Sequence, residues 1–340
     1  MLYATTLIIF SLITLFGINK VKYKKILIII FSLFLSIPLI FKTTNVDTND
    51  LSNYISIIEG NNSRDIETSF LLISDVTNLI SDSDIKYSLV LMVYVLPALL
   101  IKLLIFNKES RDFNASCLIY FSSFFFIHEF VQIRTALALG FVLLAIYQDR
   151  IALRILFFLL AAIFHVSSLI ILPFLVYDFK FYKRKMFIFL YATSLFVALF
   201  VKDKLQYVLG YAKEYNIYNG QYLLNESHIK LFPGIMYPVI FVLLSFFILD
   251  YTKNCNFNKN EKIILNIFFF SIPCYWLFSF SSVLAFRSFE FLVFFSILAI
   301  PSLFKNIKQR YFVVIIYSSI LFYYYIFSFK IIGHFELNFL

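Results

Sequence analysis

Residues 128–168 read HEFVQIRTALALGFVLLAIYQDRIALRILFFLLAAIFHVSS, and this stretch decides which fold the chain can adopt. Two long apolar runs in it have the composition of helices, and they hold Arg134 and His165. An ionisable side chain at membrane depth costs about 3 kcal/mol on insertion scales. Each of these two residues therefore needs a partner, a water-filled cavity or a function.

The composition of the whole chain indicates the same class of protein. Of the 340 residues, 61% are hydrophobic and 14% are charged, so the apolar runs must meet lipid rather than water. A run of about 20 apolar residues spans a bilayer core, and we count about ten such runs. Backbone in contact with lipid has to be helical. We therefore expect an all-α polytopic integral membrane protein in which residues 1–340 form a single transmembrane helical domain.

The charges and cysteines exclude several other classes. The net charge of +9 comes from basic clusters beside the apolar runs, which the positive-inside rule places in the cytoplasm, so we expect no nucleic-acid partner. Three widely spaced cysteines support neither a disulfide framework nor a metal site. His128 to Gln132 resembles the start of a zinc-protease motif, but glutamine stands at its second ligand position. Neither a metal nor another cofactor is expected.

Two loops are expected outside, at about residues 42–86 and 202–232. The first is acidic, and its apolar residues predict two amphipathic helices on the membrane face. The second contains tyrosines at helical spacing, namely Tyr207, Tyr211, Tyr215, Tyr218 and Tyr222. Such a tyrosine face suits a membrane interface or stacking on sugar rings.

Both ends of residues 151–176 border basic clusters, although the run is long enough to cross a membrane once. A break near His165 into two short helices would return the chain to the cytoplasmic side. We favour this broken re-entrant hairpin, with His165 at its outward-facing tip. The alternative is one tilted helix followed by a basic outer loop. The same topology makes His128 and Glu129 an outer turn and places Arg134 just below the outer surface.

Two arginines are expected near the outer face. Arg134 follows the outer turn, and Arg287 stands three residues before Glu290, close enough to pair with it. Either arginine could simply reach the interface or be capped by Glu129 or Glu290. Together with His165, the two arginines favour a polyanion site, because guanidinium binds phosphate through two hydrogen bonds and keeps its charge when desolvated.

Five elements between about residues 45 and 300 follow one another in a recognisable order. They are Asp50 to Tyr54 with Asp47 before it, Glu67-Thr-Ser-Phe70, Gln132-Ile-Arg134-Thr-Ala, Phe164-His165-Val-Ser167, and Arg287-Ser-Phe-Glu290. This pattern resembles the EpsG family, bacterial membrane proteins related to Wzy-type O-antigen and exopolysaccharide polymerases. The FHxS element that includes His165 is its most specific part.

The resemblance implies a metal-independent glycosyltransferase on the periplasmic face of the bacterial inner membrane. It would join undecaprenyl pyrophosphate-linked oligosaccharide repeat units, beside a flippase and a chain-length regulator of the same pathway. Arg134 and Arg287 would bind the substrate pyrophosphate, and His165 or Asp50 would act as general base. The supporting residues would be Asp47, Tyr54, Glu67, Gln132 and Glu290.

Two other functions fit a chain of this length. A membrane O-acyltransferase would modify the same polysaccharide, but such enzymes resemble one another in an arginine and a histidine in the first span, and residues 2–18 hold no charge. A lipid-linked oligosaccharide flippase would be longer, with two similar halves and charges that line a deep cavity. The polymerase therefore remains the favoured interpretation.

Overall fold

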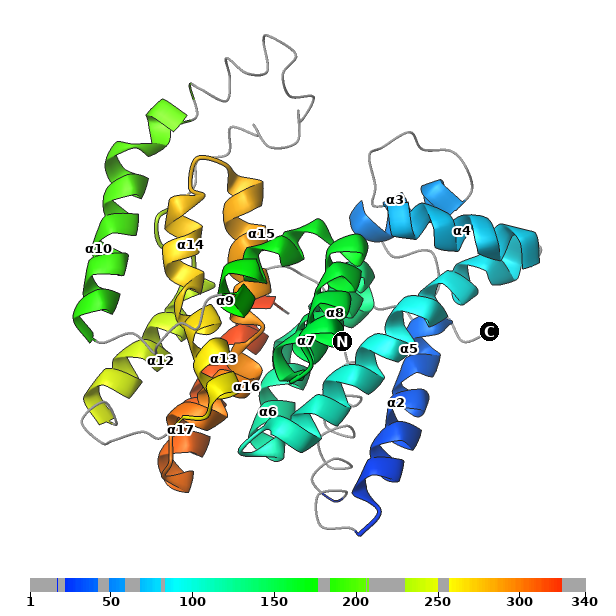
Figure 1. Cartoon of the computed structure of the whole chain (residues 1–340), viewed down its shortest axis with the longest axis horizontal. Coiled ribbons are helices and arrows are strands. Elements are labelled where there is room, and N and C mark those ends of the chain that lie inside the picture. The colour runs from blue at the N-terminus through cyan, green and yellow to red at the C-terminus, as the bar shows by residue number, and fades with distance from the viewer. Residues whose placement is uncertain are drawn as a thin grey trace. The chain divides into compact units, whose positions relative to one another are not determined.

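The computed structural model describes residues 17, 22–41, 49–58, 68–80, 83–176, 184–205, 207, 230–249 and 257–325. All regular structure in these residues is helical, as the composition predicts. Figure 1 shows the helices in chain order. The chain divides into two compact units. Unit 1 falls within Met1–Leu169 and Ile300–Leu340, and unit 2 within Ile170–Ala299. Each unit is described by itself.

Unit 1 contains most of the candidate site residues. Its helices are α2 (Lys24–Ile40), α3 (Asn49–Ile58), α4 (Thr68–Ile80), α5 (Ser83–Glu109), α6 (Phe113–Ile119), the π-helix η1 (Tyr120–Val131), α7 (Ile133–Tyr147), α8 (Ile151–Phe164) and α17 (Ile307–Tyr323). The 3-10 helix η2 (Val166–Ile171) and α16 (Ser296–Leu303) each cross the boundary between the units.

The long helix α5 is the centre of unit 1, because α2 and α7 both pack against it. Small residues on α7 let the two backbones approach closely. A Cβ atom added to Gly140 would lie 3.5 Å from Ile101 Cγ2 of α5. Helix α8 packs antiparallel on α7, and Figure 1 shows the two as a hairpin.

One face of α8 is apolar and exposed. Ile151, Ile155, Leu159 and Ile163 recur every four residues, and each has more than half of its surface exposed. Phe158 and Ala161, on the opposite face, are buried. An apolar row on the outside of a helix costs free energy in water and suits contact with lipid.

The described residues do not confirm the number of membrane spans that the sequence predicts. Judged by length and hydropathy, one described helix, Ile85–Glu109, could cross a bilayer alone. Two bent pairs would raise the number to three if each pair is one span: Phe113–Val131 with Ile133–Tyr147, bent by 117°, and Ser282–Val293 with Ser296–Leu303, bent by 49°. The expected count of about ten spans is therefore not confirmed. The first expected span, residues 2–18, lies outside the described residues apart from Gly17.

The expected outer turn at His128 and Glu129 is wrong. The helix that begins at Phe113 continues through both residues as η1, and the bend follows at Gln132. Both side chains are fully buried. The π geometry is visible in the bond from Gln132 N to Ile127 O, five residues back (2.8 Å), and π segments of this kind are frequent at functional sites.

A break at His165 is confirmed. Helix α8 ends at Phe164, His165 is extended (φ −158°, ψ 116°), and the chain continues as η2 and then α9 (Leu172–Val176). Which side of a membrane this break faces stays a prediction.

The segment 42–86, which was expected outside, contains two helices, α3 and α4, as the sequence predicts. Both pack against α5, and α4 also packs against α8. The apolar face of α3 is covered by protein, since Tyr54, Ile57 and Ile58 are at most 8% exposed. Of the tyrosine face expected in the second loop, all but Tyr207 lies outside the described residues.

Unit 2 is held together mainly by aromatic side chains. Its helices are α9, α10 (Arg184–Phe200), α12 (Met236–Leu249), α13 (Lys259–Phe269), α14 (Ser271–Leu277) and α15 (Ser282–Val293). Tyr191 of α10 donates to Phe269 O (2.8 Å), and its ring lies edge-on to Trp276 of α14 (6.0 Å). The indole of Trp276 donates to Leu231 O (2.9 Å), so both buried donors of this contact are paired.

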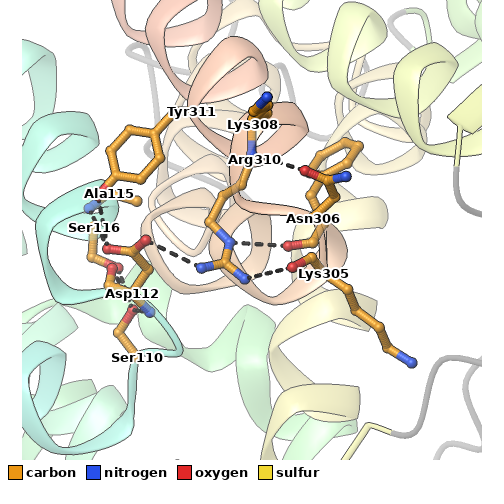
Figure 2. A network of polar contacts seen from close by, with 10 residues as sticks. Ser110, Asp112, Ala115, Ser116, Lys305, Asn306, Lys308, Arg310 and Tyr311 are labelled. Carbon is orange, nitrogen blue, oxygen red and sulfur yellow. Dashed lines mark hydrogen bonds and ion pairs between the residues drawn. The ribbon is translucent and has the colours of Figure 1, made fainter.

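A polar network joins α17 to the start of α6 (Figure 2). Arg310 Nη1 donates to Asp112 Oδ2 (3.1 Å), while its Nε and Nη2 donate to the carbonyl oxygens of Phe304 (2.9 Å) and Lys305 (3.4 Å). Asp112 also caps α6, because its Oδ1 accepts from Ala115 N (3.1 Å). The guanidinium thus lies between a carboxylate and the carbonyls that follow α16.

Replacing Arg310 by methionine should lower the free energy of unfolding by about 2 kcal/mol, because Asp112 and two backbone carbonyls lose their donor in a largely buried site. Thermal unfolding of the purified protein in nanodiscs measures the change. Lys308→Met, at an exposed position on the same helix, is the control and should unfold like the wild type. An Arg310→Met protein that is as stable as the wild type would show that the network contributes nothing.

Candidate functional site

Arg134 lies in the first turn of α7 and contacts a tyrosine of α3. Its Nε donates to the hydroxyl of Tyr54 (3.3 Å), and the guanidinium carbon is 5.2 Å from the centroid of the same ring. Tyr54 is 2% exposed, whereas Arg134 is partly exposed. Tyr54 therefore holds the arginine through both a hydrogen bond and a cation–π contact, and the guanidinium keeps its charge.

Aromatic contacts continue from Tyr54 across three further helices. Its ring stacks on Phe70 of α4 (5.1 Å), Phe70 contacts Tyr94 of α5 (5.8 Å), and Tyr94 lies edge-on to Phe164 at the end of α8 (5.6 Å). We call Tyr54, Phe70, Tyr94, Arg134 and Phe164 the Arg134 cluster. Four segments that are distant in sequence thus hold one partly exposed cation.

His165 lies at the same end of the α7–α8 hairpin as Arg134. Arg134 is thirteen positions before Tyr147, where α7 ends, and Phe164 is thirteen positions after Ile151, where α8 begins. Two antiparallel helices of equal rise therefore bring His165 to the level of the arginine. The side chain is buried, and Ser69 of α4 donates to the nearby Ile163 O (2.8 Å).

A buried ion pair lies between α5 and η1. Lys102 Nζ is 2.5 Å from Glu129 Oε1, and neither side chain has any exposed surface. The Lys102 ammonium also lies 6.0 Å from the ring centroid of Tyr120. Charges at this depth require partners, because each alone would carry a desolvation penalty of several kcal/mol. The pair holds the π-helix against α5. Glu129 lies three positions before Gln132, where the chain bends ahead of Arg134.

The alternative in which Glu129 caps Arg134 differs from the structure, where Glu129 pairs with Lys102 and Arg134 donates to Tyr54. His128 stacks on Phe124 (5.9 Å, 6° between ring planes) and lies within electrostatic range of His165. Gln132 sits at the bend, where its carbonyl accepts from Ala136 N (2.9 Å) and starts α7. It therefore shapes the turn that precedes Arg134.

Lys102 was not among the residues expected at the site. Its signal in the sequence is a single charge within the apolar run 88–106, and a charge at that depth predicts a buried partner. The identity of that partner depends on the tertiary structure, because Glu129 is 27 residues from Lys102 in the sequence. Tyr94 and Ser69 carried no such signal, because tyrosine and serine are ordinary residues in membrane helices.

The remaining expected site residues are placed as follows. Asp50 lies in the first turn of α3, four positions before Tyr54. Asp47 and Glu67 lie outside the described residues. Arg287 and Glu290 lie on α15 of unit 2, where Arg287 is exposed and Glu290 is half-buried.

The arrangement in unit 1 suits an anionic ligand. A guanidinium that is partly exposed and backed by aromatic rings can offer two parallel N–H groups to phosphate or carboxylate oxygens. Desolvation by the surrounding rings strengthens such a contact relative to water. His165, at the same end of the hairpin, adds an imidazole, the side chain used most often as a general acid or base.

The family model of the EpsG family matches residues 25–339, nearly the whole chain. Searches of curated proteins and of solved structures found no match. The matched region includes every element on which the resemblance rested, from Asp50 to Glu290. With its apolar helices, this chain is a membrane protein that belongs to the EpsG family.

Proposed function

We propose that this protein polymerises undecaprenyl pyrophosphate-linked oligosaccharide repeat units on the periplasmic face of the bacterial inner membrane, in the synthesis of O-antigen or a related surface polysaccharide. The observation that carries the proposal is the Arg134 cluster, which holds a partly exposed guanidinium at the same end of the α7–α8 hairpin as the buried histidine of the FHxS element. Membership of the EpsG family supports a polysaccharide polymerase-like role.

In the proposed reaction, a hydroxyl of the acceptor repeat unit attacks the anomeric carbon of the donor chain. The new C–O bond forms as the bond between that carbon and the pyrophosphate oxygen breaks, and the electron pair leaves with the lipid pyrophosphate. Arg134 and Arg287 would stabilise this leaving group by charge. The acceptor proton would pass to a general base.

His165 and Asp50 are the two candidates for the base, and we favour His165. Its unperturbed pKa is near 6.5, and it lies at the same end of the hairpin as Arg134. His165→Ala should lower the rate of polymerisation about 100-fold or more, measured as ladder synthesis at equal membrane expression. If only Asp50→Asn loses the ladder, the base is the aspartate and His165 is structural.

Tyr54, Gln132 and Glu290 would act by positioning. Tyr54 holds Arg134, Gln132 shapes the bend before it, and Glu290 stands beside Arg287 on α15. Asp47 and Glu67 keep the supporting roles that the family pattern implies. The pathway partners would be a flippase that delivers the lipid-linked units and a chain-length regulator.

Polysaccharide analysis by gel in a deletion strain tests the proposed function. Loss of a polymerase should leave single repeats on lipid A, and the wild-type gene should restore the ladder. A full ladder without acetyl groups would indicate an O-acyltransferase instead. Absence of both ladder and single repeats would indicate a flippase.

A further inference from the structure

Helix α4 buries small polar residues together with Phe70. Ser69, Ser74 and Thr77 are at most 5% exposed, whereas Leu72 and Leu79 are 59% and 88% exposed. Exposed leucines suit contact with lipid. Ser69 and Thr77 donate to the carbonyl oxygens of Ile163 and Ser74, so Ser74 is the buried polar residue of this helix that calls for a separate explanation.

Hydroxyl groups are buried between α4 and α5 without hydrogen bonds. Within the part of the chain that the structure describes, Ser74 Oγ and Tyr87 OH have no hydrogen-bond partner. Tyr94 OH makes no hydrogen bond of standard geometry, although the hydroxyl of Ser69, which donates to Ile163 O, lies close to it. Phe70 and Ser74 are one turn apart on α4, and Phe70 contacts Tyr94, so Ser74 lies on the face that meets α5. A buried hydroxyl without a partner destabilises a fold, and such groups in native proteins are explained by an ordered water, a bound ligand or a function.

These hydroxyls lie around the Arg134 cluster. Tyr87 and Tyr94 are seven positions apart on α5, which places them on one face of the helix. Both are within electrostatic range of Tyr54, whose hydroxyl accepts the hydrogen bond from Arg134. Two hydroxyls that can donate therefore lie near the tyrosine that holds the guanidinium, and Ser74 lies one turn along α4 from Phe70 of the same cluster.

We propose that Ser74, Tyr87 and Tyr94 donate hydrogen bonds to the phosphate oxygens of the lipid-linked substrate when Arg134 binds its diphosphate. The inference rests on the proposed function and deepens it. A cation surrounded by O–H donors matches an anion that offers many acceptors, and hydrogen bonds to a charged group are the strong ones.

Substrate access requires α4 to separate from α5, because all three hydroxyls are covered in the ligand-free chain. The described polar contact that holds α4 to α8 is the bond from Ser69 to Ile163 O. The substrate would replace Tyr54 as the partner of Arg134. Because these hydroxyls make no hydrogen bonds while α4 packs on α5, no hydrogen bond of theirs has to break when the two helices separate. They gain partners when the ligand is bound.

The test uses Tyr87→Phe, Tyr94→Phe and Ser74→Ala in the full chain, in nanodiscs, with undecaprenyl pyrophosphate that carries no saccharide as the probe. Each variant should bind the probe about ten-fold more weakly than the wild type. Each should also unfold at the same temperature as the wild type or higher, because an unpaired buried hydroxyl is removed. A hydroxyl with only a structural role would not give this combination of weaker binding and undiminished stability.

Ser318→Ala is the matched control. Ser318 on α17 is also buried, at 4% exposure, and its Oγ has no hydrogen bond within the described residues. Its removal should leave probe binding unchanged. Tyr191→Phe, which loses a bonded hydroxyl in unit 2, should lower the unfolding temperature and likewise leave binding unchanged.

Several results would overturn the inference. One is probe binding that is unchanged in all three variants, and another is an unfolding temperature that is lowered in all three. The inference also fails if the wild type does not bind the probe, or if the variants lose affinity for the free repeat-unit saccharide and keep their affinity for the probe. None of these depends on the polysaccharide ladder. A deletion strain that still makes polymer would contradict the proposed function separately.

Discussion

Replacing Arg134 by lysine should abolish the polymer ladder while the protein still folds. Lysine keeps the charge but loses the planar fork that binds two phosphate oxygens, and it also loses the guanidinium contact with the ring of Tyr54. Loss of one such donor at a developing charge costs about 3 kcal/mol of transition-state stabilisation, or roughly 100-fold in rate. The readout is the ladder in a deletion strain, at membrane expression matched by blotting.

Arg150→Lys is the matched control, because Arg150 is exposed at the opposite end of the α7–α8 hairpin, just before α8 begins. It should make a normal ladder. Arg287→Lys should lose the ladder as Arg134→Lys does, if both arginines hold the pyrophosphate. Normal ladders from both Arg134→Lys and Arg287→Lys would refute the assignment of these residues to the leaving group.

Removing either partner of the Lys102–Glu129 pair should lower the free energy of unfolding more than any other single substitution proposed for the described residues. Glu129→Leu leaves a fully buried ammonium without its carboxylate, and Lys102→Met leaves the carboxylate without its ammonium. Breaking a buried pair from one side costs about 3–5 kcal/mol, because the remaining charge stays desolvated. The amount of folded protein in the membrane and its unfolding temperature measure this loss.

The double variant Lys102→Met, Glu129→Leu should recover most of that stability, because no buried charge remains. Lys108→Met is the control: Lys108 pairs with Glu109 at 3.0 Å, but its side chain is 73% exposed, and exposed pairs contribute little. Single variants as stable as the wild type would show that the pair is not buried as described. A stable double variant that makes no polymer would show that the pair also positions the bend before Arg134.

Local structure in this chain was largely predictable because its signals are local. The apolar runs predicted helices, the acidic loop between residues 42 and 86 predicted two more, and the break at His165 followed from the basic residues at both ends of one run. The prediction of an outer turn at His128 and Glu129 was wrong for a physical reason. His128 and Glu129 look like loop residues in sequence, yet a π-helix can bury them once Lys102 supplies the opposite charge.

The sequence by itself determined that this is a helical membrane protein, and its spaced elements identified the EpsG family and made Arg134 and His165 the candidate site residues. Only the tertiary structure decided which residues meet. Tyr54 and Arg134 are 80 residues apart, and nothing in either segment specifies the other. Helical periodicity assigns a residue to a face, but its partner depends on how helices pack, and that depends on side-chain volume along the whole interface. The pairing of Lys102 with Glu129 and the buried hydroxyls of Ser74, Tyr87 and Tyr94 arise from that packing.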